Sequence, residues 1–454
     1  MFIGRTQELK KLEEAYRMEQ SNAIVLYGRS GIGKTELARL FAADKPFVFY
    51  AAKELSEQEQ CFSMAEESNL WRGEAVPPSF YDTMRLAAER VKSGSGEKVL
   101  LILDEFHLMV KTGHGFLESF IRMLNEEDSR YLFVLISSSV NWVENSMVTD
   151  MTFGARYLSG IIKVKEFSFV DMVNRFPNMP VEQTIYAAAI LGGIPGYLRF
   201  WQEKETLKEN LLRLFLTPDA VLLSEAERFL KNELRELGAY NAILAALASG
   251  KYKLNDIYAR TGFSRAKISV YIKNLIELDV VEKIFSYDAA EHANVQKGLY
   301  RVRDSFLGFW YRYVFPNLSA ISLGRGEEVY EQKILPTLEV YMRERFSDVC
   351  GEYLKLMNQY HRLQHSYVTW GSWYGKTGRI DLIAGDSGGN LLVGFCSFTE
   401  KPVTKQAYEK YKELLTLATL TPQEWFVFSK AGFDAEFTEE AKQKKITLVS
   451  MEDL

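Results

Sequence analysis

Residues 28–35 limit the possible folds of this 454-residue chain more than any other stretch. They read Gly-Arg-Ser-Gly-Ile-Gly-Lys-Thr, between an apolar, β-branched run at 23–27 and a helical pattern at 36–41. Glycines allow backbone N–H groups to curl around phosphate oxygens, and the start of a helix adds its positive dipole end. The order strand, loop, helix therefore predicts a phosphate-binding loop (P-loop) in a parallel α/β sheet.

The residue types of this loop indicate a nucleoside triphosphate, ATP, together with Mg²⁺. Lys34 would reach the β- and γ-phosphates, and the Thr35 hydroxyl would ligate Mg²⁺. We expect ATP or ADP to contact the loop and the helix start at Gly28, Ser30, Gly31, Ile32, Gly33, Lys34, Thr35 and Glu36.

A second apolar run, residues 99–103, ends in Asp104 and Glu105. A continuous apolar run is typical of a parallel strand that helices cover on both faces. Asp104 then lies at the strand end, where a carboxylate can hold Mg²⁺. Glu105 is the candidate general base that polarises the attacking water, with a salt-bridged or capping carboxylate as the alternative.

A third apolar run, residues 131–136, ends in three serines. This places a hydroxyl at the edge of the sheet where ligands bind in open α/β folds. Ser137 is therefore a candidate sensor of the γ-phosphate. The alternative is that the serines cap the helix that follows.

Together these motifs resemble the archaeal-ATPase-like branch of the AAA+ and STAND P-loop superfamily. The matching stretches are Phe2-Ile3-Gly4-Arg5 with Glu8, the P-loop, Leu103-Asp104-Glu105, the serine-tipped strand and residues 192–198. The resemblance implies that Phe2, Ile3 and Gly4 lie against the adenine. It also implies that Pro195 contacts the nucleotide from a small helical lid. Ordinary packing is the alternative for both segments.

The chain departs from this family after the third strand. Family members often carry a Gly-Arg pair there, whereas Ala155 separates Gly154 from Arg156 in this chain. Arg156 is a candidate arginine finger on a neighbouring subunit, and a solvated surface arginine is the alternative.

The middle of the chain is predicted to be a winged helix. Helical patterns at 240–248, 254–260 and 264–278 have helix-turn-helix spacing, and strands at 280–287 and 298–303 would form a hairpin around the loop 288–297. Residues 251–303 contain ten Lys or Arg against six Asp or Glu, although the whole chain carries −5. Candidate contacts to double-stranded DNA are Arg265, Lys267 and Lys273. A packing module without DNA contact is the alternative. The aromatic run 306–315 is expected to be buried.

The order of elements after residue 324 resembles the restriction-endonuclease-like PD-(D/E)XK fold. Asp381 matches the first metal-binding acid, and Glu352 is the candidate helix carboxylate. Phe395 stands where the family has its second acid, and Ser397 stands where it has its lysine. Since the site needs both, we expect this domain to keep the fold and to lack nuclease activity.

These segments predict an α/β P-loop ATPase core at 1–165, a helical lid at 166–235, a winged helix at 236–323 and a degenerate nuclease-like domain at 324–454. The chain has no apolar run of 18 residues and no signal sequence. Its three cysteines are widely spaced and form no disulfide or metal-binding pattern. We therefore expect a cytoplasmic protein without a membrane partner. The function predicted is a Mg²⁺-dependent ATPase acting as a switch or motor at DNA. The alternative is a STAND-type, ATP-gated protein-interaction scaffold with slow turnover. A protein partner or a homo-oligomer stays open in either case.

Overall fold

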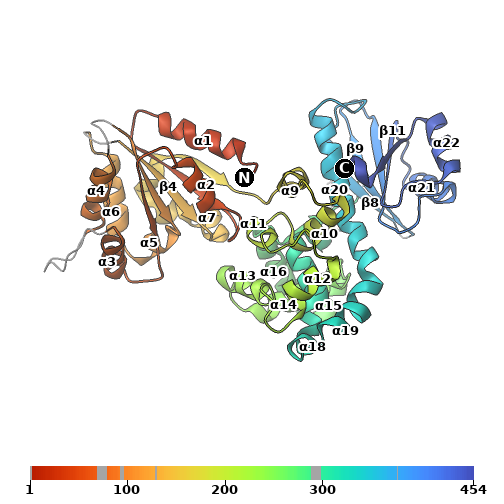
Figure 1. The fold of residues 1–454 in the computed structure, drawn as a ribbon, viewed down its shortest axis with the longest axis horizontal. Coiled ribbons are helices and arrows are strands. Elements are labelled where there is room, and N and C mark those ends of the chain that lie inside the picture. Colours follow the sequence, from red (N-terminus) through yellow and green to blue (C-terminus); the bar gives the residue numbers. More distant parts are fainter. Residues whose placement is uncertain (1–2, 69–78, 93–96, 128–129, 288–297, 376) are drawn as a thin grey trace. The chain divides into compact units, whose positions relative to one another are not determined.

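The computed structural model describes residues 3–68, 79–92, 97–127, 130–287, 298–375 and 377–454. The chain divides into two compact units (Figure 1). The N-terminal unit contains residues 2–166 with 194–196, and the C-terminal unit contains residues 167–193 and 197–454.

A five-stranded parallel sheet forms the centre of the N-terminal unit. Its strands are β1 (Asn22–Tyr27), β2 (Phe47–Ala51), β3 (Val99–Asp104), β4 (Tyr131–Ser137) and β5 (Leu158–Lys163), in the order β2-β3-β4-β1-β5. Every residue of β1 and β4 is buried, and since successive side chains point to opposite faces, both faces of the sheet are covered. The parallel α/β sheet expected from the sequence is confirmed. The carboxyl ends of β1, β3 and β4 therefore meet at one edge.

Helices of the N-terminal unit pack around this sheet (Figure 1). They are α1 (Thr6–Arg17), α2 (Lys34–Phe41), α3 (Glu57–Glu67), α4 (Phe80–Val91), α5 (His107–Thr112), α6 (Gly115–Leu124), α7 (Val140–Asn145) and α8 (Met147–Asp150). α2 begins directly at the end of the P-loop, because Gly33 takes the left-handed conformation that precedes its first turn.

The C-terminal unit begins with helices that were predicted as the lid. They are α9 (Phe169–Arg175), α10 (Val181–Leu191), α12 (Leu207–Leu211) and α13 (Glu225–Glu233), and α11 (Pro195–Leu198) starts within the segment assigned to the N-terminal unit. A capping box at Ser168 and Asp171 begins α9.

Three helices and a hairpin follow, in the element order of a winged helix. They are α14 (Leu237–Ala248), α15 (Leu254–Thr261), α16 (Arg265–Glu277), β6 (Val281–Ile284) and β7 (Leu299–Val302), and we call them the three-helix unit. The first strand is shorter than the predicted 280–287, because Ser286 bridges instead to Ser372 of the C-terminal sheet. The predicted wing loop, 288–297, lies outside the described residues.

The aromatic run forms α17 (Ser305–Phe309) and a π-helical turn at Trp310–Val314. The Phe306 ring lies 4.5 Å from that of Tyr197, and the Phe309 ring lies 5.9 Å from that of Tyr341. These side chains are buried, as expected from the sequence.

The chain ends in a mixed sheet preceded by α18 (Leu318–Ser322), α19 (Gly326–Val329) and the long α20 (Leu338–Gln359). Its elements are β8 (Thr369–Tyr374), β9 (Arg379–Gly385), β10 (Leu391–Ser397), α21 (Lys405–Leu417), β11 (Glu424–Ser429), α22 (Ala435–Lys444) and β12 (Thr447–Ser450). β8, β9 and β10 are antiparallel neighbours, and β10, β11 and β12 are parallel. The predicted order of helices and strands is observed. Just before β8, the buried Tyr367 hydroxyl donates to Glu424 Oε2 at 2.9 Å.

Candidate nucleotide-binding site

At three of its positions the P-loop has a backbone conformation that glycine adopts far more readily than other residues. Gly28 has φ 150°, Gly31 has φ 79° and Gly33 has φ 93°. A Cβ atom on Gly28 would also lie 2.5 Å from the carbonyl oxygen of Val164. Of the loop residues, Ile32 is buried, whereas Ser30, Gly31 and Glu36 are exposed.

Lys34, the first residue of α2, folds its side chain back over this loop. Its ammonium group donates to the carbonyl oxygens of Gly28 at 2.8 Å and Arg29 at 3.1 Å. The residue is 5% exposed. The positive charge therefore lies along the backbone that would enclose the phosphates.

Thr35 and Asp104, the two predicted magnesium ligands, meet directly. Thr35 Oγ1 donates to Asp104 Oδ2 at 2.6 Å, although 69 residues separate them in sequence. Burial raises the pKa of Asp104, and the hydrogen bond from Thr35 partly opposes this shift. Two protein oxygens fit a magnesium site that draws its other ligands from water and phosphate.

Glu105, the predicted base, is held by two groups that were not predicted. Its Oε2 accepts a hydrogen bond from the Ser138 amide at 2.9 Å and lies 3.3 Å from Nδ1 of His107. The Glu105 backbone has φ 53°, the left-handed region that non-glycine residues rarely occupy. The clue available in the sequence was a titratable His107 two positions after the acid.

Ser137 lies behind His107 at the end of β4. The residue is fully buried, and its Oγ lies 3.1 Å from the same Nδ1 atom. Ser139 precedes α7 and makes no side-chain capping bond there. Ser137 is therefore linked to Glu105 through the imidazole, and its role as a γ-phosphate sensor stays a prediction.

The stability of the protein is expected to depend on pH through His107. Burial is the main cause that lowers the pKa of His107 from 6.5 to about 4, so the ring is neutral at pH 7. Since the unfolded chain takes up this proton near pH 6.5 and the folded chain does so near 4, stability is lost as the pH falls through this window, by up to about 3 kcal/mol.

Urea unfolding between pH 4 and 7.5 measures this effect. His107→Gln should flatten the pH dependence, whereas His114→Gln, at an exposed histidine of the same unit, should leave it unchanged. Identical pH profiles for His107→Gln and wild type would contradict the assignment.

The segment 194–196 lies against the P-loop. The Gly196 amide donates to the Gly31 carbonyl oxygen at 2.9 Å, and a Cβ atom on Gly196 would lie 2.9 Å from Gly31 Cα. This contact brings the half-buried Pro195 beside the loop. Its contact with a nucleotide stays a prediction.

The N-terminal segment is also tied to the loop. Arg5 Nη2 donates to the Ile32 carbonyl oxygen at 3.2 Å, two residues after the half-buried Ile3. The adenine contact of Ile3 stays a prediction, and Phe2 lies outside the described residues.

Arg156 is not brought to this site. Arg156 comes just before β5, which runs parallel to β1, and the first residue of β5 pairs with Ala23 near the start of β1. The P-loop follows the other end of β1. Arg156 therefore lies at the opposite edge of the sheet. Its Nη2 donates to the Tyr157 hydroxyl at 2.7 Å, and the residue is exposed. It does not serve the P-loop of its own sheet, and action on a neighbouring subunit stays a prediction.

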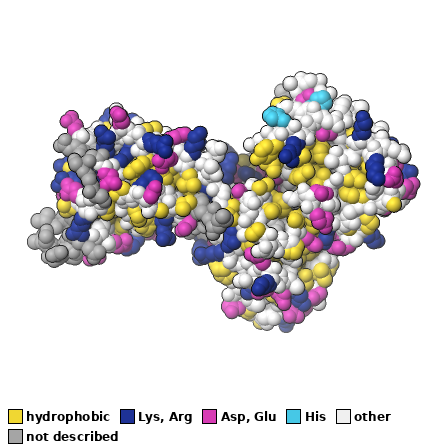
Figure 2. Space-filling model, turned by 45° about the horizontal axis from the view of Figure 1, so that its top comes forward, with side chains coloured by type: hydrophobic (Ala, Val, Ile, Leu, Met, Phe, Trp, Pro, Cys, Tyr) yellow, Lys and Arg dark blue, Asp and Glu magenta, His cyan; other side chains and the backbone are white. Residues whose placement is uncertain are grey.

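The three predicted DNA contacts lie on the exposed side of α16, opposite the buried Ile268, Ile272 and Leu275. Arg265 Nε donates to Asn255 at 2.9 Å, the Lys267 ammonium lies 4.8 Å from the Phe263 ring centre, and Lys273 lies 3.6 Å from Glu277. On the face of the protein in Figure 2, basic and acidic side chains are interspersed. A contact with nucleic acid would therefore depend on the basic side chains of α16 themselves.

The nuclease-like motif is built into the core of the C-terminal sheet. Asp381 is 2% exposed and accepts from Arg379 Nε at 2.7 Å and from the Cys396 amide at 3.1 Å. Phe395 is fully buried and stacks on Tyr411 with ring centres 3.8 Å apart. Glu352, the proposed helix carboxylate, instead accepts from the Phe169 amide at 2.8 Å, at the start of α9. Within the described ranges, no group of three or more His, Cys, Asp or Glu is placed to hold a metal ion.

Two family models match the chain. The model that matches residues 2–199 is described as an ATPase domain predominantly from Archaea. Residues 2–199 are thus similar to ATPase domains found mainly in archaea. The second model matches residues 310–410 and describes archaeal and bacterial proteins of unknown function. The nuclease-like resemblance of that region therefore stays a prediction.

The similarity to one relative extends well beyond the ATPase domain. An uncharacterized protein of Methanocaldococcus jannaschii is 28% identical over 396 residues, which cover 85% of this chain and 84% of that protein. Among solved structures, a Walker-type ATPase of Pyrococcus abyssi is 16% identical, with 68% of this chain and 96% of that chain covered and a TM-score of 0.46. The ORC2 protein of Aeropyrum pernix is 14% identical, with 71% of this chain and 94% of that chain covered and a TM-score of 0.44.

Among the described helices, none has the length and apolar character needed to cross a membrane.

Proposed function

We propose that this protein binds and hydrolyses ATP and that the nucleotide controls its contact with double-stranded DNA. The observation that carries the ATPase assignment is the hydrogen-bonded group at one sheet edge. Thr35 donates to Asp104 at 2.6 Å, and Glu105, the next residue, is held by the Ser138 amide at 2.9 Å. Phosphoryl transfer requires positioned ligands for charge and a positioned base for water, and these residues supply both.

Each residue has a separate role in this proposal. The P-loop amides and Lys34 bind and orient the phosphates. Thr35 and Asp104 would hold Mg²⁺, which when bound supplies positive charge beside the phosphate oxygens. Glu105 orients water and accepts its proton. The Ser138 amide and the neutral His107 hold the Glu105 carboxylate in one orientation.

The DNA contact is proposed for the exposed side of α16. Recognition helices of this class place residues near their N-terminus against the major groove, and Arg265 and Lys267 lie in the first turn. The contact of Lys273 with Glu277 is an exposed ion pair. Such pairs contribute little to stability, so the ammonium group can exchange its partner for a phosphate.

An ATP-gated protein scaffold is the second candidate, because the same helix side also presents an apolar residue. Val270 is 58% exposed on α16, among the basic side chains. A single exposed apolar residue is compatible with a protein partner, and the net charge of −5 on the whole chain does not favour nucleic-acid binding through bulk charge.

Replacing Arg265 and Lys267 together by alanine is expected to weaken binding of a short DNA duplex. Each lost phosphate contact should reduce the slope of log affinity against log salt concentration by about 1. Fluorescence anisotropy of a labelled duplex, with ATP present and at two or more salt concentrations, measures both quantities.

The matched control is Lys204→Ala with Lys231→Ala, which removes two exposed charges outside α16. Salt-dependent DNA binding that only the α16 variant weakens would support the proposal. Absent or salt-independent binding would favour the protein scaffold.

A further inference from the structure

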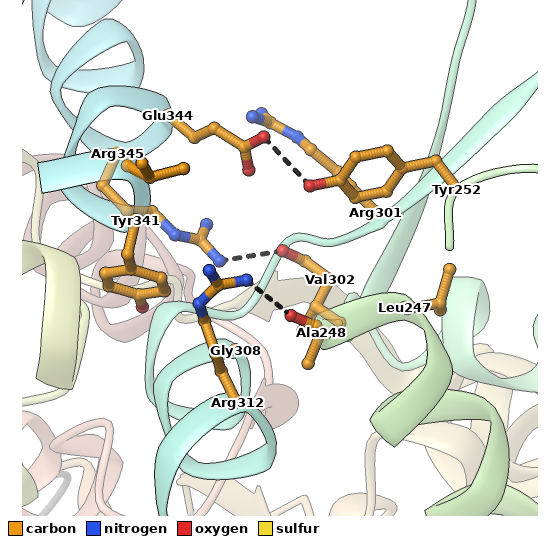
Figure 3. A pocket seen from close by; sticks show the side chains of 11 residues that line it. Leu247, Ala248, Tyr252, Arg301, Val302, Gly308, Arg312, Tyr341, Glu344 and Arg345 are labelled. Atoms are coloured by element: carbon orange, nitrogen blue, oxygen red, sulfur yellow. Dashed lines mark hydrogen bonds between the residues drawn. The ribbon is translucent and has the colours of Figure 1, made fainter. Parts of the chain in front are cut away.

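A small pocket lies inside the C-terminal unit. It has a volume of about 50 Å³ and is bounded by the end of α14, β7, the turn at 310–314 and α20 (Figure 3). The lining contains three arginines, Arg301, Arg312 and Arg345, and one carboxylate, Glu344. The lining therefore carries an excess of positive charge.

Two of these arginines, Arg301 and Arg345, already have a carboxylate within ion-pair distance, which for Arg345 is Asp348 at 3.7 Å. Arg301 Nη2 donates to Asp348 at 2.8 Å, and the same guanidinium also pairs with Glu282. Arg345 donates to the carbonyl oxygens of Val302 at 2.9 Å and Arg303 at 3.0 Å. Both guanidinium groups are thus accounted for by the protein itself.

Arg312 differs from the other two. Its Nη1 donates to the Ala248 carbonyl oxygen at 3.0 Å, and its Nε is buried without a hydrogen-bond partner. Across the described part of the chain, no carboxylate lies within ion-pair distance of Arg312. A buried donor without an acceptor, on a group that keeps its charge, is unfavourable unless something else fills the site.

Glu344 does not neutralise Arg312, because it is engaged on the other side of the pocket. Its Oε1 accepts from the Tyr252 hydroxyl at 3.0 Å (Figure 3). The same oxygen lies 3.9 Å from Arg379 Nη1. In the close-up, the guanidinium groups of Arg312 and Arg345 point toward each other in the middle of the pocket. Two cations facing each other favour an anion between or beside them.

We propose that this pocket binds a small oxyanion, namely a phosphate group, with Arg312 as its main ligand. A space of about 50 Å³ holds a few water-sized groups, so it admits a phosphate group. The fork of N–H donors on a guanidinium matches two oxygens of one phosphate. The bound anion would link α14 and β7 of the three-helix unit to α20.

The probe for this site is inorganic phosphate, titrated into the full chain carrying Lys34→Ala so that the P-loop does not contribute. Thermal unfolding and calorimetry should show saturable binding, and sodium chloride at equal ionic strength should not reproduce it. Adding Arg312→Gln should weaken phosphate binding by at least about tenfold, because a charge-assisted, two-bond contact is lost.

Two further variants protect the test against a folding defect in Arg312→Gln. Glu344→Gln removes the one carboxylate of the lining and is expected to tighten phosphate binding several-fold. Arg325→Gln, at an exposed arginine outside the pocket, is expected to bind as its parent does. No saturable binding in the parent and in Glu344→Gln would overturn the proposal, as would equal binding in Arg312→Gln.

A further arm distinguishes the two sources of such a group. If a 5′-phosphorylated dinucleotide competes with inorganic phosphate and its unphosphorylated form does not, the site takes a terminal phosphate. If neither dinucleotide competes while inorganic phosphate still binds, the site takes the free ion. Either result supports the site, and both are independent of whether the P-loop hydrolyses ATP.

Discussion

Lys34→Ala is expected to weaken ATP binding by about 100-fold, the loss of a charge-assisted interaction of about 3 kcal/mol. The Lys34 ammonium lies over the P-loop backbone, 2.8 Å from the Gly28 carbonyl oxygen, and is largely shielded from water. A charge in such a place interacts with phosphate more strongly than an exposed lysine does. Alanine removes the charge and keeps the helical propensity at the start of α2.

Thermal-shift titration with ATP and Mg²⁺ measures this loss. Lys11→Ala, at an exposed lysine on α1 of the same unit, is the control and should bind ATP as the wild type does. The unfolding temperature without nucleotide shows whether Lys34→Ala is folded. A folded Lys34→Ala protein with wild-type affinity would remove the P-loop assignment.

Glu105→Gln is expected to reduce steady-state ATP hydrolysis by at least about 100-fold while ATP binding changes little. Glutamine keeps the length of the side chain and an oxygen that can accept from the Ser138 amide. It cannot accept a proton from water. The two effects separate because Glu105 belongs to the chemical step, whereas Lys34 holds the phosphates.

Phosphate release by wild type, Glu105→Gln and the exposed control Glu118→Gln tests this role, each with and without DNA. Hydrolysis that DNA stimulates and that only Glu105→Gln removes would support a DNA-coupled ATPase. Near-wild-type turnover in Glu105→Gln would place the base elsewhere. Tight ATP binding with negligible turnover in wild type would favour the ATP-gated scaffold.

The features predicted best from the sequence are contiguous. The P-loop needs only eight adjacent residues between a strand and a helix, so the local pattern was sufficient for its conformation. Three of the buried strands were recognised because continuous apolar runs, 23–27, 99–103 and 131–136, make up most of each strand, which reflects burial on both faces. Asp104 and Ser137 were placed at one edge because parallel strands end there together.

The features missed or misplaced depend on partners far apart in the chain. Ser138 holds Glu105 because β3 and β4 are neighbours, and no periodicity reveals that contact. Glu352 was the candidate helix carboxylate of the nuclease-like motif, and its observed partner, the Phe169 amide, is 183 residues away in sequence.

Local sequence thus specified the elements of this protein and the chemistry of its P-loop, since backbone conformation and strand burial leave direct marks on residue type. Packing between distant segments decided which side chains meet. Arg312 illustrates the difference: its buried, unpaired Nε arises only where α14, β7 and α20 converge. Hydrogen bonding and charge pairing act over a few ångströms in space, so they follow from the tertiary structure and are independent of distance along the chain.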